Sequence, residues 1–205
     1  MRTLAIDSAT EACSVALFDG DGLIAGEWRQ LGRGHAEALV PMIAALPGKG
    51  RADRIAVSLG PGSFTGLRVG LAAARALALA WGSELVGFPT LALVAAMARK
   101  ERGAVPILVA MTGGHGEWFV EGFAADGASS RALSSLAPAM AAQCSEGLVV
   151  GSQAEALVAL RGAGEAMPLL PDARALPLLP AKCLRPADLL YGRAPDARLP
   201  AAAAP

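Results

Sequence analysis

The feature that most restricts the fold is a glycine-rich turn between an apolar strand and a long apolar helix, in residues 58–70 (SLGPGSFTGLRVG). Residues 54–59 form a short apolar run typical of a buried strand, and the glycines and proline at 60–62 force a turn. Ser63 or Thr65 can cap the following helix, which we expect to run to about Trp81. A strand that turns directly into a helix indicates an α/β fold.

The same turn allows two interpretations. The N-terminus of a helix has free N–H groups and a positive dipole end, so it can bind an anion, while glycines let another backbone or a partner approach closely. The pattern is neither an NTPase phosphate loop, since no Lys-Ser/Thr pair follows, nor a good dinucleotide fingerprint, since Thr65 replaces the third glycine. Structural turn and anion site both stay open. The candidate anion-binding residues here are Gly60, Gly62, Ser63, Thr65 and Arg68.

The apolar patterns along the first half of the chain predict the element order βββαβα and then β. Alternating residues indicate three antiparallel strands, which helices then connect to parallel strands. This order is that of the ribonuclease-H-like half of the actin and sugar-kinase fold. The predicted elements are strands at 3–6, 12–18 and 23–30, a helix at 35–46, a strand at 54–59, a helix at 64–81 and a strand at 84–88.

The second half predicts a further lobe of similar type, although no sequence repeat is visible. Its predicted elements are a leading helix at 90–100, paired strands at 106–111 and 117–123, a strand at 148–152, and helices at 153–160 and 186–190. Residues 124–147 allow no assignment, and four prolines make 162–183 mostly extended or loop. We predict lobes at 1–100 and 101–198, with the C-terminal stretch packing back on the first lobe, and a disordered tail at 199–205.

Composition excludes several functions. The 18 basic and 18 acidic side chains balance, so the basic excess expected of a protein that grips nucleic acid unaided is absent. Three widely spaced cysteines indicate neither a disulfide framework nor a zinc site, so we predict no metal. The chain begins directly with a strand, and no apolar run reaches the ~18 residues of a membrane span. A cytoplasmic protein without membrane contact is expected.

Three motifs, in this order, resemble the bacterial TsaB family of tRNA threonylcarbamoyladenosine biosynthesis proteins. They are residues 4–17 (LAIDSATEACSVAL), residues 35–41 (HAEALVP) and residues 60–70 (GPGSFTGLRVG). The resemblance is strong over residues 1 to about 100 and weak from 106 to 120. In the loop at 112–115, the family more usually has an Asp and two basic residues where this chain has Thr112, Gly114 and His115. A family ligand contact at this loop is therefore an open question.

The resemblance implies a two-lobed, actin-like fold with mixed sheets flanked by helices, and no catalysis by the isolated chain. Such proteins are required to support a related catalytic subunit, TsaD, which makes N6-threonylcarbamoyladenosine beside the anticodon of tRNAs. An ATPase subunit, TsaE, joins them, and the chain can also form a homodimer. The resemblance thus implies that this chain contacts tRNA only as part of the complex. It also implies that the partner subunits, and not this chain, bind ATP and magnesium.

Asp7 closes the first strand, and Ser8 and Thr10 lie in the turn that follows it. In kinase-like relatives of this fold, this turn faces a triphosphate and its magnesium. A carboxylate can organise metal-bound water, and turn hydroxyls can bind phosphate oxygens. The alternative is an Asp that caps the hairpin turn. The second lobe offers no acidic phosphate turn to complete a nucleotide site, which favours the cap. Because Ser63 has no nearby base, we predict no catalytic residue.

The two helices at 35–46 and 64–81 carry small and apolar residues around most of their circumference, which calls for burial on both sides. Either a partner or the second lobe can supply it, and the resemblance implies the partner. The candidate interface residues are His35, Leu39, Val40, Ile43, Gly66, Gly70, Ala73, Ala76 and Leu77. For His35 alone, the residues favour a surface or capping role. The rival functions are a stand-alone small-molecule kinase or ATPase of this fold and, less favoured, a glycoprotease.

Overall fold

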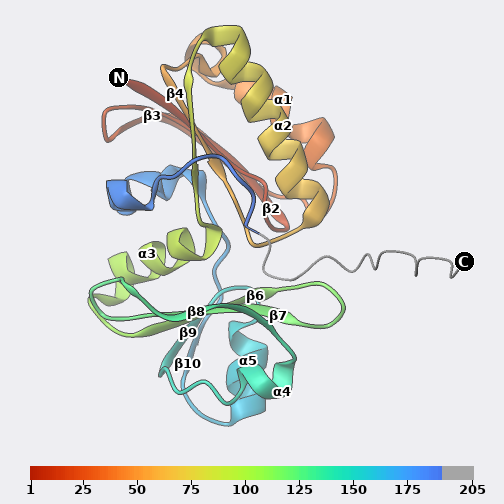
Figure 1. The fold of residues 1–205 in the computed structure, drawn as a ribbon, viewed down its shortest axis with the longest axis vertical. Helices are drawn as coiled ribbons and strands as arrows, with labels where there is room; N and C mark the ends of the chain where they lie inside the picture. Colours follow the sequence, from red (N-terminus) through yellow and green to blue (C-terminus); the bar gives the residue numbers. More distant parts are fainter. Residues whose placement is uncertain (191–205) are drawn as a thin grey trace, which may run out of the picture.

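The computed structural model describes residues 1–190, which form two lobes, one above the other (Figure 1). The tail predicted at 199–205 lies outside these residues. The first sheet contains β1 (Arg2–Asp7), β2 (Ala12–Asp19), β3 (Gly22–Gln30), β4 (Arg54–Ser58) and β5 (Glu84–Phe88). The second contains β6 (Ile107–Thr112), β7 (Trp118–Phe123), β8 (Ser129–Leu136), β9 (Leu148–Val150) and β10 (Glu165–Met167). The helices are α1 (His35–Ala45), α2 (Phe64–Trp81), α3 (Thr90–Arg102), α4 (Pro138–Ala141) and α5 (Ala154–Arg161), with 3-10 helices η1 (Pro47–Gly50), η2 (Ala173–Leu178) and η3 (Ala181–Cys183).

The two sheets share one topology. The first has the order β3-β2-β1-β4-β5, and the second has the corresponding order β8-β7-β6-β9-β10. In each, the central strand pairs antiparallel with the next strand of the chain and parallel with the strand on its other side. This confirms the predicted fold class, with two mixed sheets flanked by helices. In the stretch where the sequence allowed no assignment, β8 and α4 complete the second lobe.

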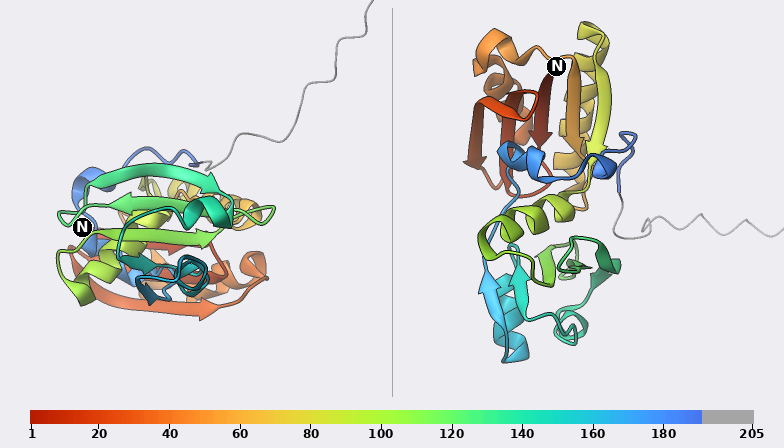
Figure 2. Two further views of the ribbon diagram at one scale, coloured as in Figure 1. Left: turned by 90° about the horizontal axis from the view of Figure 1, so that it is seen from below. Right: turned by 90° about the vertical axis from the view of Figure 1, so that its left-hand side faces the viewer.

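The layers alternate between helices and sheets (Figures 1 and 2). Helices α1 and α2 cover one face of the first sheet, and α4 and α5 cover the far face of the second. Helix α3 lies between the sheets and is apolar on both sides. Its Leu93 packs with the first sheet and η2, whereas Leu91 and Val94 pack with the second sheet. One helix therefore belongs to both cores and ties the lobes together.

After β10 the chain returns to the first lobe and packs on its sheet. The Ala173 N–H donates to the Ser14 hydroxyl at 2.9 Å, and η2 lies against β1, β2 and β3. Farther on, Arg185 pairs with Gly87 at the edge of β5, and the Leu190 N–H donates to the Leu59 carbonyl at 2.8 Å. The helix predicted at 186–190 is wrong, because the Arg185 and Leu190 N–H groups bond to the first lobe instead of forming helical turns.

Within residues 1–190, α2 is the one helix with the length and apolar composition to cross a membrane. Its inner face, which includes Leu67, Leu71 and Ala74, is buried against the first sheet. At its start, the Ser63 hydroxyl accepts a hydrogen bond from the Gly66 N–H at 3.2 Å, so Ser63 is the N-cap. The apolar residues on the inner face of α2 therefore pack within the chain.

Candidate functional site

The turn between β1 and β2, where a nucleotide site was considered, is buried and bonded to itself. Asp7 lies at the end of β1, and its Oδ1 accepts a hydrogen bond from the Ala9 N–H at 3.0 Å. The Thr10 hydroxyl accepts from the Ala12 N–H at 3.2 Å. Asp7 thus caps its own turn, as the structural alternative proposed.

The glycines after β4 let α2 approach this turn. A Cβ built on Gly62 would lie within 3.0 Å of the Ala9 carbonyl oxygen, and one on Gly66 within 3.0 Å of the Ser8 carbonyl oxygen. The Ser63 N–H donates to the Ala9 carbonyl at 2.6 Å, and the Ser8 hydroxyl donates to the Gly66 carbonyl at 2.9 Å. The close approach of the two backbones accounts for these glycines.

The remaining candidate anion-binding residues, Gly60, Thr65 and Arg68, do not lie together. Gly60 has a left-handed φ of 91°, and its carbonyl accepts the Thr90 N–H at 3.0 Å. Thr65 and Arg68 are exposed, and the Arg68 guanidinium stacks on the Phe64 ring. The structure therefore brings Asp7, Ser8, Gly62 and Ser63 together at one turn, but it leaves Thr65 and Arg68 on the surface. The space between turn and helix is filled by the chain itself.

The Asp7 carboxyl is completely buried, and its Oδ2 has no hydrogen-bond partner. Burial raises the pKa of Asp7 from 3.8 to about 7, against the opposing effects of the hydrogen bond from the Ala9 N–H and of the Ser58 hydroxyl. The negative charge of Asp172 raises this pKa further. Asp7 thus titrates close to neutral pH.

The corresponding loop of the second lobe is bonded to a neighbouring loop. The Thr112 and Ser152 hydroxyls lie 3.1 Å apart, the Gln153 amide donates to the Thr112 hydroxyl at 2.8 Å, and the Thr112 N–H donates to Ser152 at 3.0 Å. These contacts join the β6–β7 hairpin to the loop before α5. Gly114 and His115 lie in the exposed part of the hairpin. In residues 1–190, no group of three or more His, Cys, Asp or Glu side chains could hold a metal ion.

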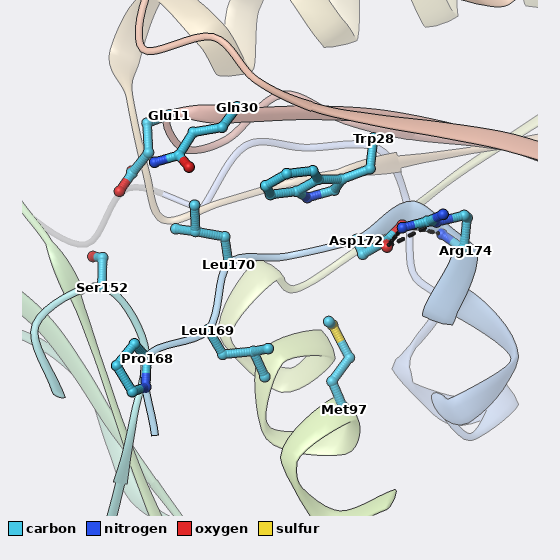
Figure 3. A pocket seen from close by; sticks show the side chains of 10 residues that line it. All are labelled: Glu11, Trp28, Gln30, Met97, Ser152, Pro168, Leu169, Leu170, Asp172 and Arg174. Atoms are coloured by element: carbon cyan, nitrogen blue, oxygen red, sulfur yellow. Dashed lines mark hydrogen bonds and ion pairs between the residues drawn. The ribbon is translucent and has the colours of Figure 1, made fainter. Parts of the chain in front are cut away.

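A cleft of about 470 Å³ lies between the lobes and was not predicted. It is lined by Glu11, Trp28, Gln30, Met97, Ser152, Pro168, Leu169, Leu170, Asp172 and Arg174 (Figure 3). The chain contributes these residues from five separate segments, so no local motif indicates the cleft. Only the packing of the returning segment between the lobes brings them together.

Several residues predicted for a partner interface are internal. His35, Leu39 and Ile43 are buried, because their i, i+4 spacing places them on the face of α1 that covers the sheet. His35 was predicted to have a surface or capping role; it is buried, with its Nε2 3.3 Å from the Ala12 carbonyl oxygen, so the surface role is wrong. Gly66 and Gly70 are buried against Ser8.

The outer face of the same helices nevertheless exposes large apolar side chains, beside the exposed Arg68 and Arg75. Val40 is 60% exposed, Phe64 64% and Leu79 88%. Ala76 is exposed, while Ala73 and Leu77 are half-buried. Of the predicted interface residues, Val40 and Ala76 therefore lie on the surface. Phe64 and Leu79 were missed, although their size and place on an apolar helix are visible in the sequence.

Comparisons with known proteins show which family this chain resembles. A family model described as TsaD, tRNA N6-adenosine threonylcarbamoyltransferase, matches residues 29–162. The tRNA threonylcarbamoyladenosine biosynthesis protein TsaB of Escherichia coli K12 is 39% identical over 122 residues, which cover 57% of this chain and 52% of that protein. TsaB of Haemophilus influenzae is 41% identical over 95 residues, covering 43% of this chain and 39% of that protein. The chain thus matches about half the length, or less, of these curated relatives.

Solved structures extend the likeness over both lobes. YeaZ from Pseudomonas aeruginosa has a TM-score of 0.70 and 26% identity, and covers 85% of this chain and 88% of its own. A second P. aeruginosa structure, described as an uncharacterized protein with similarity to peptidase YEAZ, has a TM-score of 0.72 and 28% identity, with the same shares covered.

Proposed function

The chain belongs to the tRNA N6-adenosine threonylcarbamoyltransferase family, in its TsaB/YeaZ-like form, and from this premise we propose that it is a non-catalytic, required subunit of a bacterial tRNA-modifying complex. The complex makes N6-threonylcarbamoyladenosine beside the anticodon, and this chain acts as scaffold and activator of a TsaD-type catalytic subunit. A TsaE-type ATPase joins them. The complex works in the cytoplasm, and the isolated chain needs no cofactor.

The observation that carries the proposal is the filled nucleotide turn. A triphosphate would need the N–H groups and hydroxyls at the end of β1, but α2 lies on them. The Ser8 hydroxyl and the Ser63 N–H already have partners in this contact. Opening it would leave the buried Ser8 hydroxyl without its hydrogen bond, at a cost of about 1–3 kcal/mol. This supports a chain that does not bind and turn over nucleotide by itself.

The exposed apolar face of α1 and α2 supports the role of a partner-binding subunit. Val40, Phe64 and Leu79 together expose large apolar side chains on neighbouring helices, and Ala76 lets a second backbone come close. We propose that the TsaD-type subunit binds this face and that, without it, a second copy of the chain does. Since the formal net charge is 0, tRNA is gripped by the other subunits.

The two rival functions are less well supported. A stand-alone kinase or ATPase would need an accessible phosphate turn in each lobe, and here one turn is filled and the other is bonded to the loop before α5. A glycoprotease would need an activated nucleophile, whereas the Ser63 hydroxyl serves as the cap of α2. Because this turn is filled, we expect ATP and magnesium to be bound by the partner subunits and not by this chain.

A glutamate at position 76 is expected to weaken binding of the TsaD-type subunit, and homodimer formation, at least about tenfold. The unpaired charge would be removed from water at the centre of an apolar interface. Ala76 is exposed in the single chain, so Ala76→Glu leaves the fold intact. Ala73 is half-buried, so Ala73→Glu would also disturb folding. Sedimentation of the variant, alone and mixed with the partner, measures both associations.

The matched control is Ala156→Glu, which places the same charge at an exposed alanine of α5, on the other lobe. It should associate like the unchanged chain. If Ala76→Glu folds normally by circular dichroism and associates as tightly as Ala156→Glu, the partner binds another face.

A further inference from the structure

The cleft between the lobes has no part in the function proposed above, and its walls combine aromatic, apolar and charged side chains. The Trp28 indole forms one wall (Figure 3). Its N–H already donates to the Pro171 carbonyl at 3.1 Å, so the group left for a ligand is the aromatic ring. Met97, Leu169 and Leu170 line the cleft below the ring. The middle of the cleft is therefore aromatic and apolar.

The two ends of the cleft differ in charge. At one end, the Arg174 guanidinium donates hydrogen bonds to Asp172, with its Nε and Nη2 2.8 and 2.6 Å from Oδ2, so these charges neutralise each other. At the other end, Glu11 and Gln30 lie close together (Figure 3). In the described part of the chain, neither side chain has a hydrogen bond or ion pair within the protein. The cleft walls thus carry one uncompensated negative charge, that of Glu11.

We propose that this cleft binds a small organic cation, an ammonium or guanidinium group on an apolar body. The cation bonds to the Glu11 carboxylate with help from the Gln30 carbonyl oxygen, and its body lies against Trp28 and the leucines. Cations are attracted both to carboxylates and to the faces of indole rings. A volume of about 470 Å³ is in the range of small-molecule sites.

The same charges argue against other ligands. A phosphate would meet the Glu11 carboxylate, and the one guanidinium in the cleft walls is already engaged by Asp172. A neutral apolar molecule would cover Glu11 without bonding to it, which is costly for a carboxylate. The cation could be a free metabolite-sized molecule or the side chain of an arginine or lysine in a bound polypeptide, since both present the same group.

Ligand-observed NMR titration tests the proposal with benzamidinium and its neutral analogue benzamide as probes. We expect saturable binding of benzamidinium and at least about tenfold weaker binding of benzamide, since charge-assisted hydrogen bonds are worth that factor or more. Glu11→Gln should weaken benzamidinium binding about tenfold. The matched control is Glu37→Gln, an exposed glutamate of α1 outside the cleft, which should leave binding unchanged.

The tripeptide Gly-Arg-Gly, used as a competitor, separates the two sources of the cation. Stronger Glu11-dependent binding of the tripeptide supports a polypeptide side chain, and stronger binding of benzamidinium supports a free small molecule. The proposal is overturned if neither probe binds saturably, or if both bind Glu11→Gln as tightly as the unchanged chain. Because no partner subunit is present, failure here leaves the proposed function untouched, and the reverse also holds.

Discussion

The free energy of unfolding is expected to fall by about 3 kcal/mol as the pH rises from about 4 to about 7, through Asp7 alone. The pKa of this carboxyl is 3.8 in the unfolded chain and about 7 in the buried site. Between these values the folded state holds a proton that the unfolded state has released. Stability is therefore greatest below the unfolded pKa and is lost as the pH rises through the folded one.

Asp7→Asn should remove most of this pH dependence, because the amide is neutral throughout. Its oxygen can still accept the Ala9 N–H, as the Asp7 Oδ1 does. The measurement is urea denaturation at about pH 4.5, 6 and 7.5, with Asp21→Asn, in an exposed turn, as the control. Equal pH dependence in Asp7→Asn and the control would mean that Asp7 titrates normally in the folded chain.

Replacing Gly66 by alanine is expected to lower the free energy of unfolding by about 3 kcal/mol. Helix propensity alone predicts the opposite sign, since alanine is favoured over glycine inside a helix by about 1 kcal/mol. The new Cβ, however, would lie within 3.0 Å of the Ser8 carbonyl oxygen, a backbone atom that can move only with the β1–β2 turn. Overpacking of this kind costs about 1–3 kcal/mol and occasionally more.

The sign of the change in unfolding free energy for Gly66→Ala decides between helix propensity, which predicts a gain, and overpacking against Ser8, which predicts a loss. Thr65→Ala is the control, since this side chain is exposed in the same turn of α2 and should change stability by less than about 0.5 kcal/mol. Thermal and urea denaturation measure both variants. A Gly66→Ala variant as stable as the unchanged chain, or more so, would show that α2 does not rest tightly on the turn.

Most of the first lobe could be predicted from sequence because its signals are local. Alternating residues mark β1, β2 and β3, and the Gly-Pro-Gly turn with Ser63 marks the start of α2. The role of the glycines could not be decided in the same way. An anion site and a close backbone contact require the same residues, and only the position of Ser8 and Ala9 against α2 distinguishes them.

Other features depend on contacts between distant segments. His35 is buried because α1 lies on the start of β2, which its neighbours in sequence do not reveal. Residues 124–147 are small and partly polar, so no periodicity marks β8 or α4. The segment 186–190 has the composition of a short helix, but backbone bonding to the first lobe on either side of it prevails. The cleft combines five such segments and has no sequence signal.

The most direct test of the account is the formation of N6-threonylcarbamoyladenosine in tRNA by reconstituted mixtures. The chain is combined with the TsaD-type and TsaE-type proteins of the same organism, ATP, magnesium and a threonylcarbamoyl donor, and each protein is omitted in turn. The account predicts product only when the chain and the TsaD-type subunit are both present, and about tenfold less with Ala76→Glu at limiting concentrations. Product from the chain alone, or undiminished product without it, would contradict the account.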